Sequence, residues 1–504
     1  MKIVIPKKIT VFFLILVVTA FLFAGCKNNT TDKTESTNEI LQSGEFNNES
    51  ESETVNYYAS YLPDKDCEGY EFRVIGLANG YFGLNPAVDV EAENGETVND
   101  SVYKRNRLIE ERYNIRIKQT TVAGYDDPTI KFKTSVFAGS DDFDLCLMIS
   151  RDAWAQAISG MIIPVKELRY LDVSQPWYAH DVNKHISIGG KLYFAYSDEC
   201  LNMFEQTICV MFNKKLVADL ELENLYNLVK NNKWTIDKFF ELSRKAVADL
   251  DGDGKMTDAD QYGILSQADM FYASFWVSSG IKTVGKDAND YLIFTGDSEK
   301  LYNVLEKVYQ NIFGGEKIMF DGLTDKNNAA YAPDIVSNQF ENNLGLFYVS
   351  FVGQVPNLRA METDFGILPV PKYDESQDKY YSRVIDGWIN CVPITAQDLD
   401  RISIIMEALA VESKNITMPA YFETALRTKY SRDDESKEML DIIYANRTTD
   451  LGDTFYMDPV RNTYVSVLMA KKNDFASSVE KNMKAINKVL DKANETVAAL
   501  DNIG

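Results

Sequence analysis

The first part of the chain alternates between apolar and polar positions in a way that predicts a strand, a helix and a second strand. Residues 70–77 (YEFRVIGL) alternate and then turn apolar, and residues 115–122 (IRIKQTTV) alternate again. Between them, residues 97–114 carry apolar side chains at helical spacing. The residues on this apolar face are Val98, Val102, Ile109 and Tyr113. This order predicts a parallel sheet, because parallel strands need a helical crossover.

The same patterns continue further along the chain. Residues 130–149 predict a helix, a Gly-Ser-Asp turn and the strand FDLCLMI. Residues 190–196 (GKLYFAY) and 207–213 (TICVMFN) predict two further strands. Residues 234–250 predict a helix in which Thr235 is the N-cap.

The last periodic segment is at residues 477–500, where the apolar positions make one stripe, as in a helix that faces a core. The residues of this stripe are Val479, Met483, Ile486, Leu490, Ala493 and Val497. The sequence contains no internal repeat. The alternation of strands and helices therefore predicts an α/β fold.

A run of aspartates interrupts these patterns at residues 249–263 (DLDGDGKMTDADQYG). Its spacing matches the EF-hand calcium loop, in which a glycine makes the sharp turn and oxygen atoms of alternate residues hold the ion. Gly254 occupies the glycine position. The predicted ligands are Asp249, Asp251, Asp253, the carbonyl of Lys255, Thr257 and Asp260. Hard oxygen ligands at this spacing predict Ca²⁺ binding.

Two features of this loop favour a structural calcium clip over a calcium sensor. The last ligand is Asp260, whose side chain is shorter than that of the usual glutamate. The strand-like sequence QYGIL follows the loop, whereas a sensor needs two helices that swing apart. Extracellular calcium modules bind at about 10⁻⁴ to 10⁻³ M, so such a loop would stay filled outside the cell. The alternative is an acidic, solvated turn without calcium.

The N-terminus predicts export of the protein. Basic residues precede an apolar run over residues 9–23 that is too short to span a bilayer comfortably, which is the layout of a secretory signal peptide. The sequence AGC then resembles the lipobox of bacterial lipoproteins, which predicts a signal peptide over residues 1–25 and lipidation of Cys26. The alternative is an uncleaved membrane anchor. Residues 26–65 are mostly polar, and we expect a disordered tether there, because such a segment cannot bury enough apolar surface to become ordered.

Composition narrows the classes of partner and fold. The chain has 504 residues, of which 45% are hydrophobic, and a formal charge of −23. This charge argues against nucleic acid and against an acidic membrane surface as partners. The length beyond the tether predicts two domains or lobes. Five cysteines besides Cys26, with no CxxC pair, argue against a disulfide framework, and we expect Cys146 and Cys209 to be buried.

The sequence carries no recognisable catalytic motif. It contains no GxSxG, HExxH or Walker sequence, and its only histidines are His180 and His185. A pair of carboxylates could serve a glycosidase, but among 75 acidic residues such a pair carries little weight. The neighbours Asp198 and Glu199 would point to opposite faces of a strand. We therefore expect that the protein is not an enzyme.

Several stretches together resemble the extracellular solute-binding proteins, family 1, of ATP-driven sugar importers, a family that includes maltose-binding protein. They resemble in particular a large lipoprotein form found in clostridial bacteria. The resemblance covers about residues 66–504. The stretches that carry it include ETVNDSVYKRNRLIEERYNI (96–115), FAGSDDFDL (137–145), IGGKLYFAYSD (188–198), VMFNKKL (210–216), LYNLVKNNKWTIDKF (225–239), DGWINCVPIT (386–395) and YFETALRTKYSRDDESKEMLDII (421–443).

The resemblance implies a two-lobed α/β fold of the periplasmic-binding-protein type (type II), with a hinge between the lobes and the ligand held between them. The first lobe would comprise residues 66–198 with 390–430. The second would comprise 199–389 with 431–504 and would include the calcium loop at 249–260. The hinge crossings would lie near residues 193–198 and 388–393.

Ligand residues are expected on loops after strands and at the hinges. A sugar presents apolar C–H faces to aromatic rings and hydroxyl groups to polar side chains. The selected residues are Tyr81, Phe82 and Trp154 in the first lobe, Asp198 and Glu199 at the first hinge, Tyr272, Trp276, Tyr348 and Phe351 in the second lobe, and Asp386 and Trp388 at the second hinge. Trp388 lies where the family often stacks a sugar. Each aromatic residue could instead serve core packing.

The resulting interpretation is a monomeric receptor, lipid-anchored on the extracellular face of the cell membrane. It would capture a carbohydrate, in particular an oligosaccharide, and deliver it to the permease subunits of an ABC transporter. One alternative is a receptor for a peptide or another small solute, or one that feeds a sensor kinase. An alternative from another class is a surface glycan hydrolase.

Overall fold

The computed structural model describes residues 56–501 except 81–82, 323–331 and 423–433. All the described residues belong to one compact unit, Asn56–Gly504. The predicted signal peptide, Cys26 and most of the predicted tether lie outside the described residues, as do Tyr81 and Phe82. Within the part of the chain that is described, no helix combines the length and the apolar character needed to cross a membrane.

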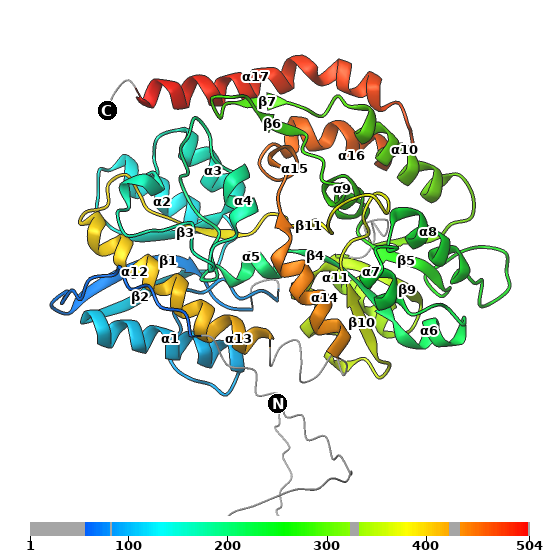
Figure 1. Cartoon of the computed structure of the whole chain (residues 1–504), viewed down its shortest axis with the longest axis horizontal. Helices are drawn as coiled ribbons and strands as arrows, with labels where there is room; N and C mark the ends of the chain where they lie inside the picture. Colours follow the sequence, from blue (N-terminus) through cyan, green and yellow to red (C-terminus); the bar gives the residue numbers. More distant parts are fainter. Residues whose placement is uncertain (1–55, 81–82, 323–331, 423–433, 502–504) are drawn as a thin grey trace, which may run out of the picture. The chain divides into compact units, whose positions relative to one another are not determined.

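The first of two large sheets has four strands in the order β12-β3-β1-β2 (Figure 1). These are β1 (Tyr70–Leu77), β2 (Ile115–Val122), β3 (Leu145–Ile149) and β12 (Trp388–Cys391). Strand β1 runs parallel to both β2 and β3, whereas β12 returns from far along the chain and pairs with β3 in the antiparallel direction. Three strands of this sheet therefore come from one continuous part of the chain, residues 70–149, and the fourth comes from residues 388–391.

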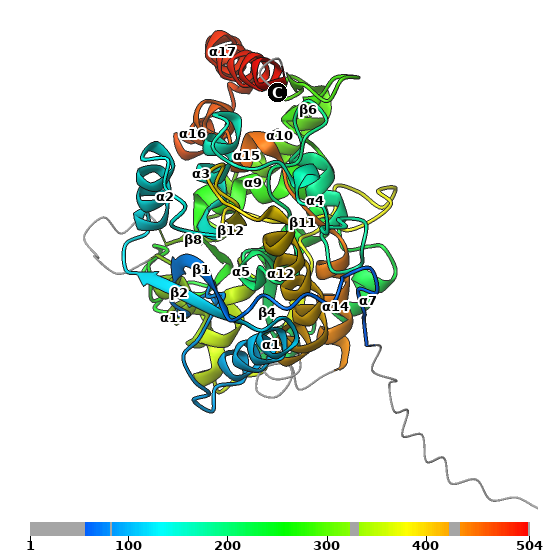
Figure 2. The same ribbon diagram turned by 90° about the vertical axis from the view of Figure 1, so that its left-hand side faces the viewer.

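Helices cover both faces of the first sheet. On one face, α1 (Thr97–Tyr113) and α12 (Leu399–Glu412) pack through Ile109, Tyr113 and Ile405 onto β1 and β2 (Figure 2). On the other face, α2 (Asp127–Phe137) and α3 (Ser150–Ile158) pack through Phe132 and Ala153. The sheet is thus buried on both faces, as its apolar strands require.

The second large sheet has five strands in the order β10-β4-β9-β5-β8. These are β4 (Ile208–Asn213), β5 (Tyr262–Ser266), β8 (Met319–Asp321), β9 (Gly345–Phe351) and β10 (Phe365–Leu368). Helices α7 (Leu225–Lys230), α8 (Ile236–Lys245), α9 (Ala268–Ser278) and α10 (Glu299–Phe313) share a core with one face of this sheet. Helices α11 (Ala332–Glu341) and α14 (Asp434–Ala445) share a core with the other face.

The chain passes between the two sheets on adjacent segments. It leaves the first sheet before α5 (Leu201–Glu205), and it returns between β11 (Ser382–Arg383) and β12. The Asn202 side chain joins the two passages, since its oxygen accepts from the Trp388 backbone N–H (2.8 Å) and its amide donates to the Trp388 carbonyl (3.0 Å). Residues 388–391, predicted to be part of a hinge, instead form β12 inside the first sheet, so the return passage lies at residues 384–387.

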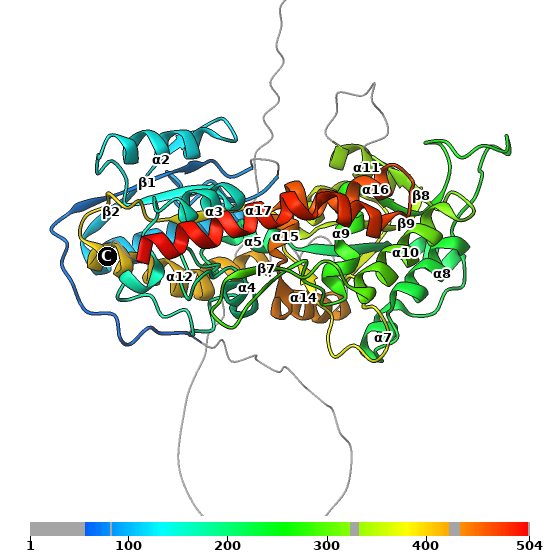
Figure 3. The same cartoon turned by 90° about the horizontal axis from the view of Figure 1, so that it is seen from above.

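The C-terminal helix α17 (Phe475–Asp501) packs against the helices that cover both large sheets. Phe475 and Val479 belong to the core around α8 and α9, whereas Leu490 and Val497 belong to the core that contains α3. Figures 1 and 3 show α17 running across the unit beside β7 (Leu292–Phe294). The predicted apolar stripe is therefore confirmed. Its last turns, assigned to the second lobe from the sequence, lie against α3 of the first sheet.

Most predicted elements are confirmed, but the predicted strand at 190–196 is wrong. The strands at 70–77, 115–122 and 208–213 and the Thr235 cap, whose hydroxyl accepts from the Lys238 N–H (3.3 Å), are present. Residues 190–196 instead form an irregular buried segment in which the Asn183 side chain bonds to both the N–H (2.8 Å) and the carbonyl (3.1 Å) of Tyr196. A side chain thus satisfies backbone groups that a neighbouring strand would otherwise pair.

Candidate functional site

Polar side chains, two of them partly exposed, gather where β3 ends and the return passage arrives. Helix α3 begins there, and the Ser150 hydroxyl (2.5 Å) and the Arg151 backbone N–H (3.3 Å) donate to Oδ1 of Asp386. The Arg151 guanidinium forms an ion pair with the other oxygen of Asp386. The side chains remain 37% (Arg151) and 15% (Asp386) exposed. Burial raises the pKa of Asp386, while Arg151 and Ser150 oppose that shift.

Tyr125 is the aromatic residue on the outside of this gathering. It lies in the loop after β2, and the Arg151 guanidinium stands 5.4 Å from the centre of its ring. Its ring meets that of Trp388 edge to face at 5.5 Å. Tyr125 is half-buried, whereas Trp388 is only 1% exposed. In this conformation Tyr125, and not the predicted Trp388, offers a ring surface to a ligand.

The start of α9 brings a second exposed carboxylate to the passage. The Arg461 guanidinium donates to the carbonyl of Asp269 (2.6 Å), and the Asp269 side chain stays 40% exposed. The Arg383 guanidinium, in β11 directly before the return passage, donates to the carbonyl of Met270 (2.9 Å). We call Tyr125, Arg151, Asp269 and Asp386 the crossing site. Tyr125, Arg151 and Asp386 contact one another, and Asp269 lies in the first turn of α9, which is bonded to Arg383.

A buried ion network holds the return passage and the start of α9 in place. The carboxylate of Asp453, in α15 (Leu451–Thr454), accepts two bonds from the Arg383 guanidinium (2.6 and 2.8 Å). Arg461 Nε lies 3.4 Å from the same carboxylate. The Arg383 and Asp453 side chains are 4% and 0% exposed. A bidentate pair of this kind fixes both partners in orientation, and through Arg383 and Arg461 it fixes the start of α9.

Trp154 and Glu205 join segments around the crossing site without reaching the surface. The Trp154 indole N–H donates to the hydroxyl of Tyr456 (3.0 Å), and its ring stacks on Phe455 at 5.3 Å. The buried carboxylate of Glu205 accepts from the backbone N–H (2.7 Å) and the side-chain amide of Asn85, in the loop after β1. Burial raises the pKa of Glu205 to about 7. The predicted Trp154 therefore has a packing role in this conformation.

The other predicted ligand residues lie apart from the crossing site. Trp276 is buried, and its indole donates to Asp450 (3.1 Å). Asp198 is buried, where it accepts from the Tyr444 hydroxyl (2.5 Å) and faces Lys414 (3.3 Å). Glu199 accepts from the amide of Asn390. Tyr348 and Phe351 are buried in β9. Tyr272 lines a cavity of about 1110 Å³ at the β8 edge of the second sheet.

Three crossing-site residues were not selected from the sequence. Tyr125 lies in the loop after β2, where ligand residues were expected, whereas Arg151 and Asp269 lie in the first turns of the helices that follow β3 and β5. The expectation of loop positions therefore pointed to Tyr125 alone. The sequence does not show which aromatic ring of a contacting pair is covered, so Trp388 was selected in place of Tyr125.

The predicted calcium loop has the backbone arrangement that its sequence demands. Oxygen atoms of Asp249, Asp251 and Asp253 lie within 4.8 Å of one another. Gly252 and Gly254 have positive φ angles of 73° and 80°, and their N–H groups donate to the carboxylate of Asp249 (2.7 Å each). Asp260, buried at the end of the loop, accepts from the backbone N–H groups of Thr257 (2.7 Å) and Leu250 (2.8 Å). These bonds lower the pKa of Asp260, so the carboxylate is charged at neutral pH. The converging carboxylates of Asp249, Asp251 and Asp253 fit a divalent cation with hard oxygen ligands, whereas both carboxylate oxygens of Asp260 accept hydrogen bonds within the loop.

Comparison with known proteins supports the fold. No protein-family model and no curated protein matches the sequence. Among solved structures, a sugar transporter from Rhizobium etli in an open conformation has 15% identity and a TM-score of 0.56, over 86% of this chain and 100% of that chain. A cyclo/maltodextrin-binding protein complexed with maltotetraose has 14% identity and a TM-score of 0.55, over 83% and 97%. The sugar-binding protein MalE from Xanthomonas citri has 13% identity and a TM-score of 0.55, over 84% and 98%.

At these identities the likeness shows the fold alone. The chain has the two-lobed α/β fold of the maltose-binding-protein type, and this prediction is confirmed. The two large sheets are the centres of the two lobes. Which of the remaining residues belong to which lobe stays a prediction.

Proposed function

We propose that this protein is a lipid-anchored extracellular receptor that captures a carbohydrate between its lobes and delivers it to an ATP-driven import permease. The crossing site carries the proposal, because it presents an aromatic ring beside partly exposed charged groups on the passage between the lobes. Support comes from solved structures of the same fold, which include binding proteins described with maltotetraose and acarbose.

The chemistry of the crossing site suits a neutral, hydroxyl-rich ligand. The carboxylates of Asp386 and Asp269 accept hydrogen bonds from hydroxyl groups, and the Arg151 guanidinium donates to them. The Tyr125 ring offers an apolar surface to the C–H face of a sugar. Because Arg151 already balances Asp386, a neutral ligand meets little uncompensated charge. Capture and release need no covalent step, which agrees with binding proteins among the structural relatives.

The lipid anchor and the delivery to a permease rest on the sequence. The apolar run and AGC predict export and a lipid on Cys26, and the polar segment that follows would hold the lobes away from the membrane. The permease partner follows from the resemblance to the sugar-importer family.

A thermal-shift screen of the full-length chain against mono- and oligosaccharides, with calcium present, tests the proposed ligand class. A ligand at a hundred times its Kd adds about 2.7 kcal/mol to the stability of the folded state, which gives a clear shift in Tm. A response to oligosaccharides supports a carbohydrate receptor. A flat response from folded protein would contradict it and favour a peptide or another solute. Release of products from labelled oligosaccharides would instead indicate a glycan hydrolase.

We also propose that the loop at 249–260 binds Ca²⁺ as a structural clip. Without the ion, three exposed carboxylates repel one another within 4.8 Å, so removal of calcium should loosen the segment between α8 and β5. We expect a chelator to lower Tm in the wild type and to leave Tm unchanged in Asp253→Asn/Asp251→Asn, with the same sugar preference in both. An identical Tm of the wild type with and without the chelator would contradict the clip.

A further inference from the structure

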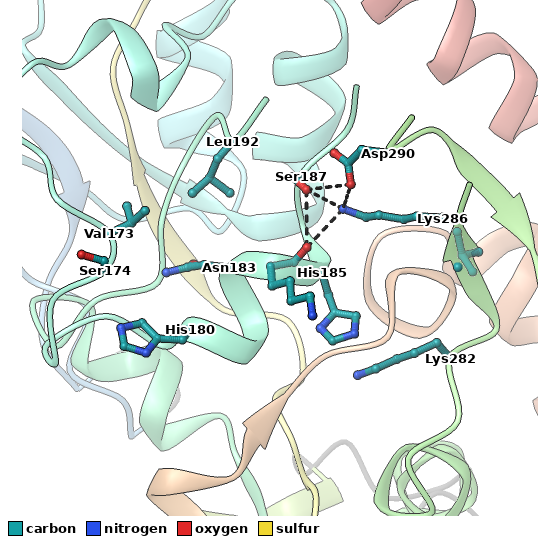
Figure 4. A pocket seen from close by; sticks show the side chains of 13 residues that line it. Val173, Ser174, His180, Asn183, His185, Ser187, Leu192, Lys282, Lys286 and Asp290 are labelled. Carbon is teal, nitrogen blue, oxygen red and sulfur yellow. Dashed lines mark hydrogen bonds and ion pairs between the residues drawn. The ribbon is translucent and has the colours of Figure 1, made fainter. Parts of the chain in front are cut away.

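A cavity of about 820 Å³ gathers an unusual concentration of basic side chains for so acidic a chain (Figure 4). One wall is α4 (His180–His185) and the residues around it, and the other is the hairpin that starts with β6 (Val284–Lys286). The basic residues of the lining are His180, Lys184, His185, Lys282 and Lys286. They include both histidines of a chain whose formal charge is −23. We call this cavity the basic pocket.

The acidic residue of the lining, Asp290, already forms an ion pair and hydrogen bonds within the protein. The Lys286 ammonium meets Asp290 Oδ1 at 2.9 Å and donates to the Ser187 hydroxyl at 2.6 Å. The other oxygen of Asp290 accepts from the Gly190 N–H at 2.9 Å. Asp290 therefore balances Lys286 and ties the hairpin to the segment after α4. It leaves the charges of Lys184 and Lys282 to be balanced by other groups.

The charge of Lys282 disfavours the protonated form of His185 in this pocket. Burial lowers the pKa of Lys282 to about 8, although Asp450 and Asp181 act in the other direction, and its ammonium donates to the carbonyl of Thr449 (2.5 Å). Burial and the charge of Lys282 lower the pKa of His185, whose Nδ1 lies 2.6 Å from the carbonyl of Asp181. An anion in the pocket would relieve this repulsion, because it favours the charged form of each neighbouring base.

We propose that the basic pocket binds the phosphate group of a small molecule, at a site separate from the carbohydrate. Phosphate carries up to two negative charges and presents acceptor oxygens in several directions, which suits the lysine and histidine donors that line both walls of the pocket. No residue of the crossing site lines this pocket.

The size of the pocket leaves room for an organic part on the phosphate. Val173, Leu192 and Val284 supply apolar wall beside the basic groups. The phosphate group could arrive as the free ion or as a monoester, and the ester alone would use these apolar residues. The binding experiment therefore includes both forms.

Isothermal titration of the full-length chain, in buffer of low salt without phosphate, tests the proposal. The probes are inorganic phosphate, n-propyl phosphate and acetate, none of which is a sugar, so the result does not depend on the proposed carbohydrate function. We expect saturable binding of a phosphate probe with a Kd below about 1 mM and much weaker binding of acetate. Tighter binding of propyl phosphate assigns an ester, and tighter binding of inorganic phosphate assigns the free ion.

Variants of exposed or half-buried lining residues provide the control. Lys184 is exposed and His185 is half-buried, so Lys184→Gln/His185→Gln should fold with an unchanged melting curve and bind phosphate at least tenfold more weakly. Lys133→Gln, on exposed α2, removes a charge outside the pocket and should bind as the wild type does. Absence of saturable phosphate binding, an equal loss in Lys133→Gln, or acetate binding as tight as phosphate would overturn the proposal.

Discussion

The crossing site and the basic pocket handle charge in opposite ways. At the crossing site, Arg151 pairs with Asp386, and behind it Arg383 pairs with Asp453. In the basic pocket, basic residues outnumber the single lining carboxylate, Asp290, and the charges of Lys282 and Lys286 lower the pKa of His185. The same acidic chain thus builds one region in which charges cancel and another in which positive charge is left over. The first suits a neutral ligand and the second an anion.

Removal of one partner of a buried ion pair should have the largest effect on stability. Asp453→Ala leaves the buried guanidinium of Arg383 without its bidentate partner, and we expect a loss of about 3–5 kcal/mol in the free energy of unfolding. Urea denaturation measures this loss. The matched control is Asp491→Ala on the exposed side of α17, which should change the stability by less than about 0.5 kcal/mol.

A small effect of Asp453→Ala, similar to that of Asp491→Ala, would contradict the view that the buried pair organises the passage. The basic pocket gives the contrast. There Lys184→Gln should leave the stability nearly unchanged, because this lysine is exposed and its removal relieves repulsion among cations.

Glu205 provides a third case. Its carboxylate is buried, and its hydrogen-bond donors are amide groups of Asn85 instead of a cation. Its pKa in the folded protein is raised from 4.5 to about 7, chiefly by burial. The folded protein holds the Glu205 proton more tightly than the unfolded chain does. The protonated group therefore contributes its full stability below about pH 4.5, and this contribution is lost as the pH rises through about 7. We therefore expect the wild type to lose about 1–3 kcal/mol of stability from this group between pH 4.5 and 7.5.

Glu205→Gln removes the titrating group and keeps an oxygen that can accept from the Asn85 N–H. Its stability should depend less on pH over this window and should exceed that of the wild type at pH 7.5. Urea denaturation of both proteins across the pH range measures the difference. Parallel stability curves for the two proteins would contradict a raised pKa of Glu205.

Local sequence patterns predicted much of the fold because burial in strands and helices is periodic. The strand at 70–77 and the helix at 97–114 each show their buried face in the sequence. The run at 190–196 was wrong for a reason that no local pattern reveals. Its apolar side chains are largely buried, but the backbone N–H and carbonyl of Tyr196 bond to the side chain of Asn183 and not to a neighbouring strand.

The candidate site could be predicted less well, because it depends on which side chain covers which. Trp388 and Tyr125 are far apart in the sequence, and only the pairing of β12 with β3 brings their rings together. That pairing turns the tryptophan inward and leaves the tyrosine outside. Asp386 was selected from the sequence, but its partner Arg151 becomes visible only when the return passage meets the end of β3.

The smallest expected change in free energy concerns Tyr125 and separates its role from that of Trp388. Tyr125→Ala removes the outer ring of the crossing site, and we expect oligosaccharide binding to weaken at least tenfold, or about 1.4 kcal/mol, with little change in Tm. Trp388→Ala, expected from the sequence to weaken binding as strongly, removes a ring that is 1% exposed and should lower the stability by about 3–5 kcal/mol. Titration with the best oligosaccharide of the screen, alongside urea denaturation, measures both quantities. Tyr125→Phe keeps the ring and should bind nearly as the wild type does. If Trp388→Ala loses affinity while its stability is unchanged, and Tyr125→Ala binds normally, then the tryptophan turns outward when a sugar is bound and the tyrosine only covers it.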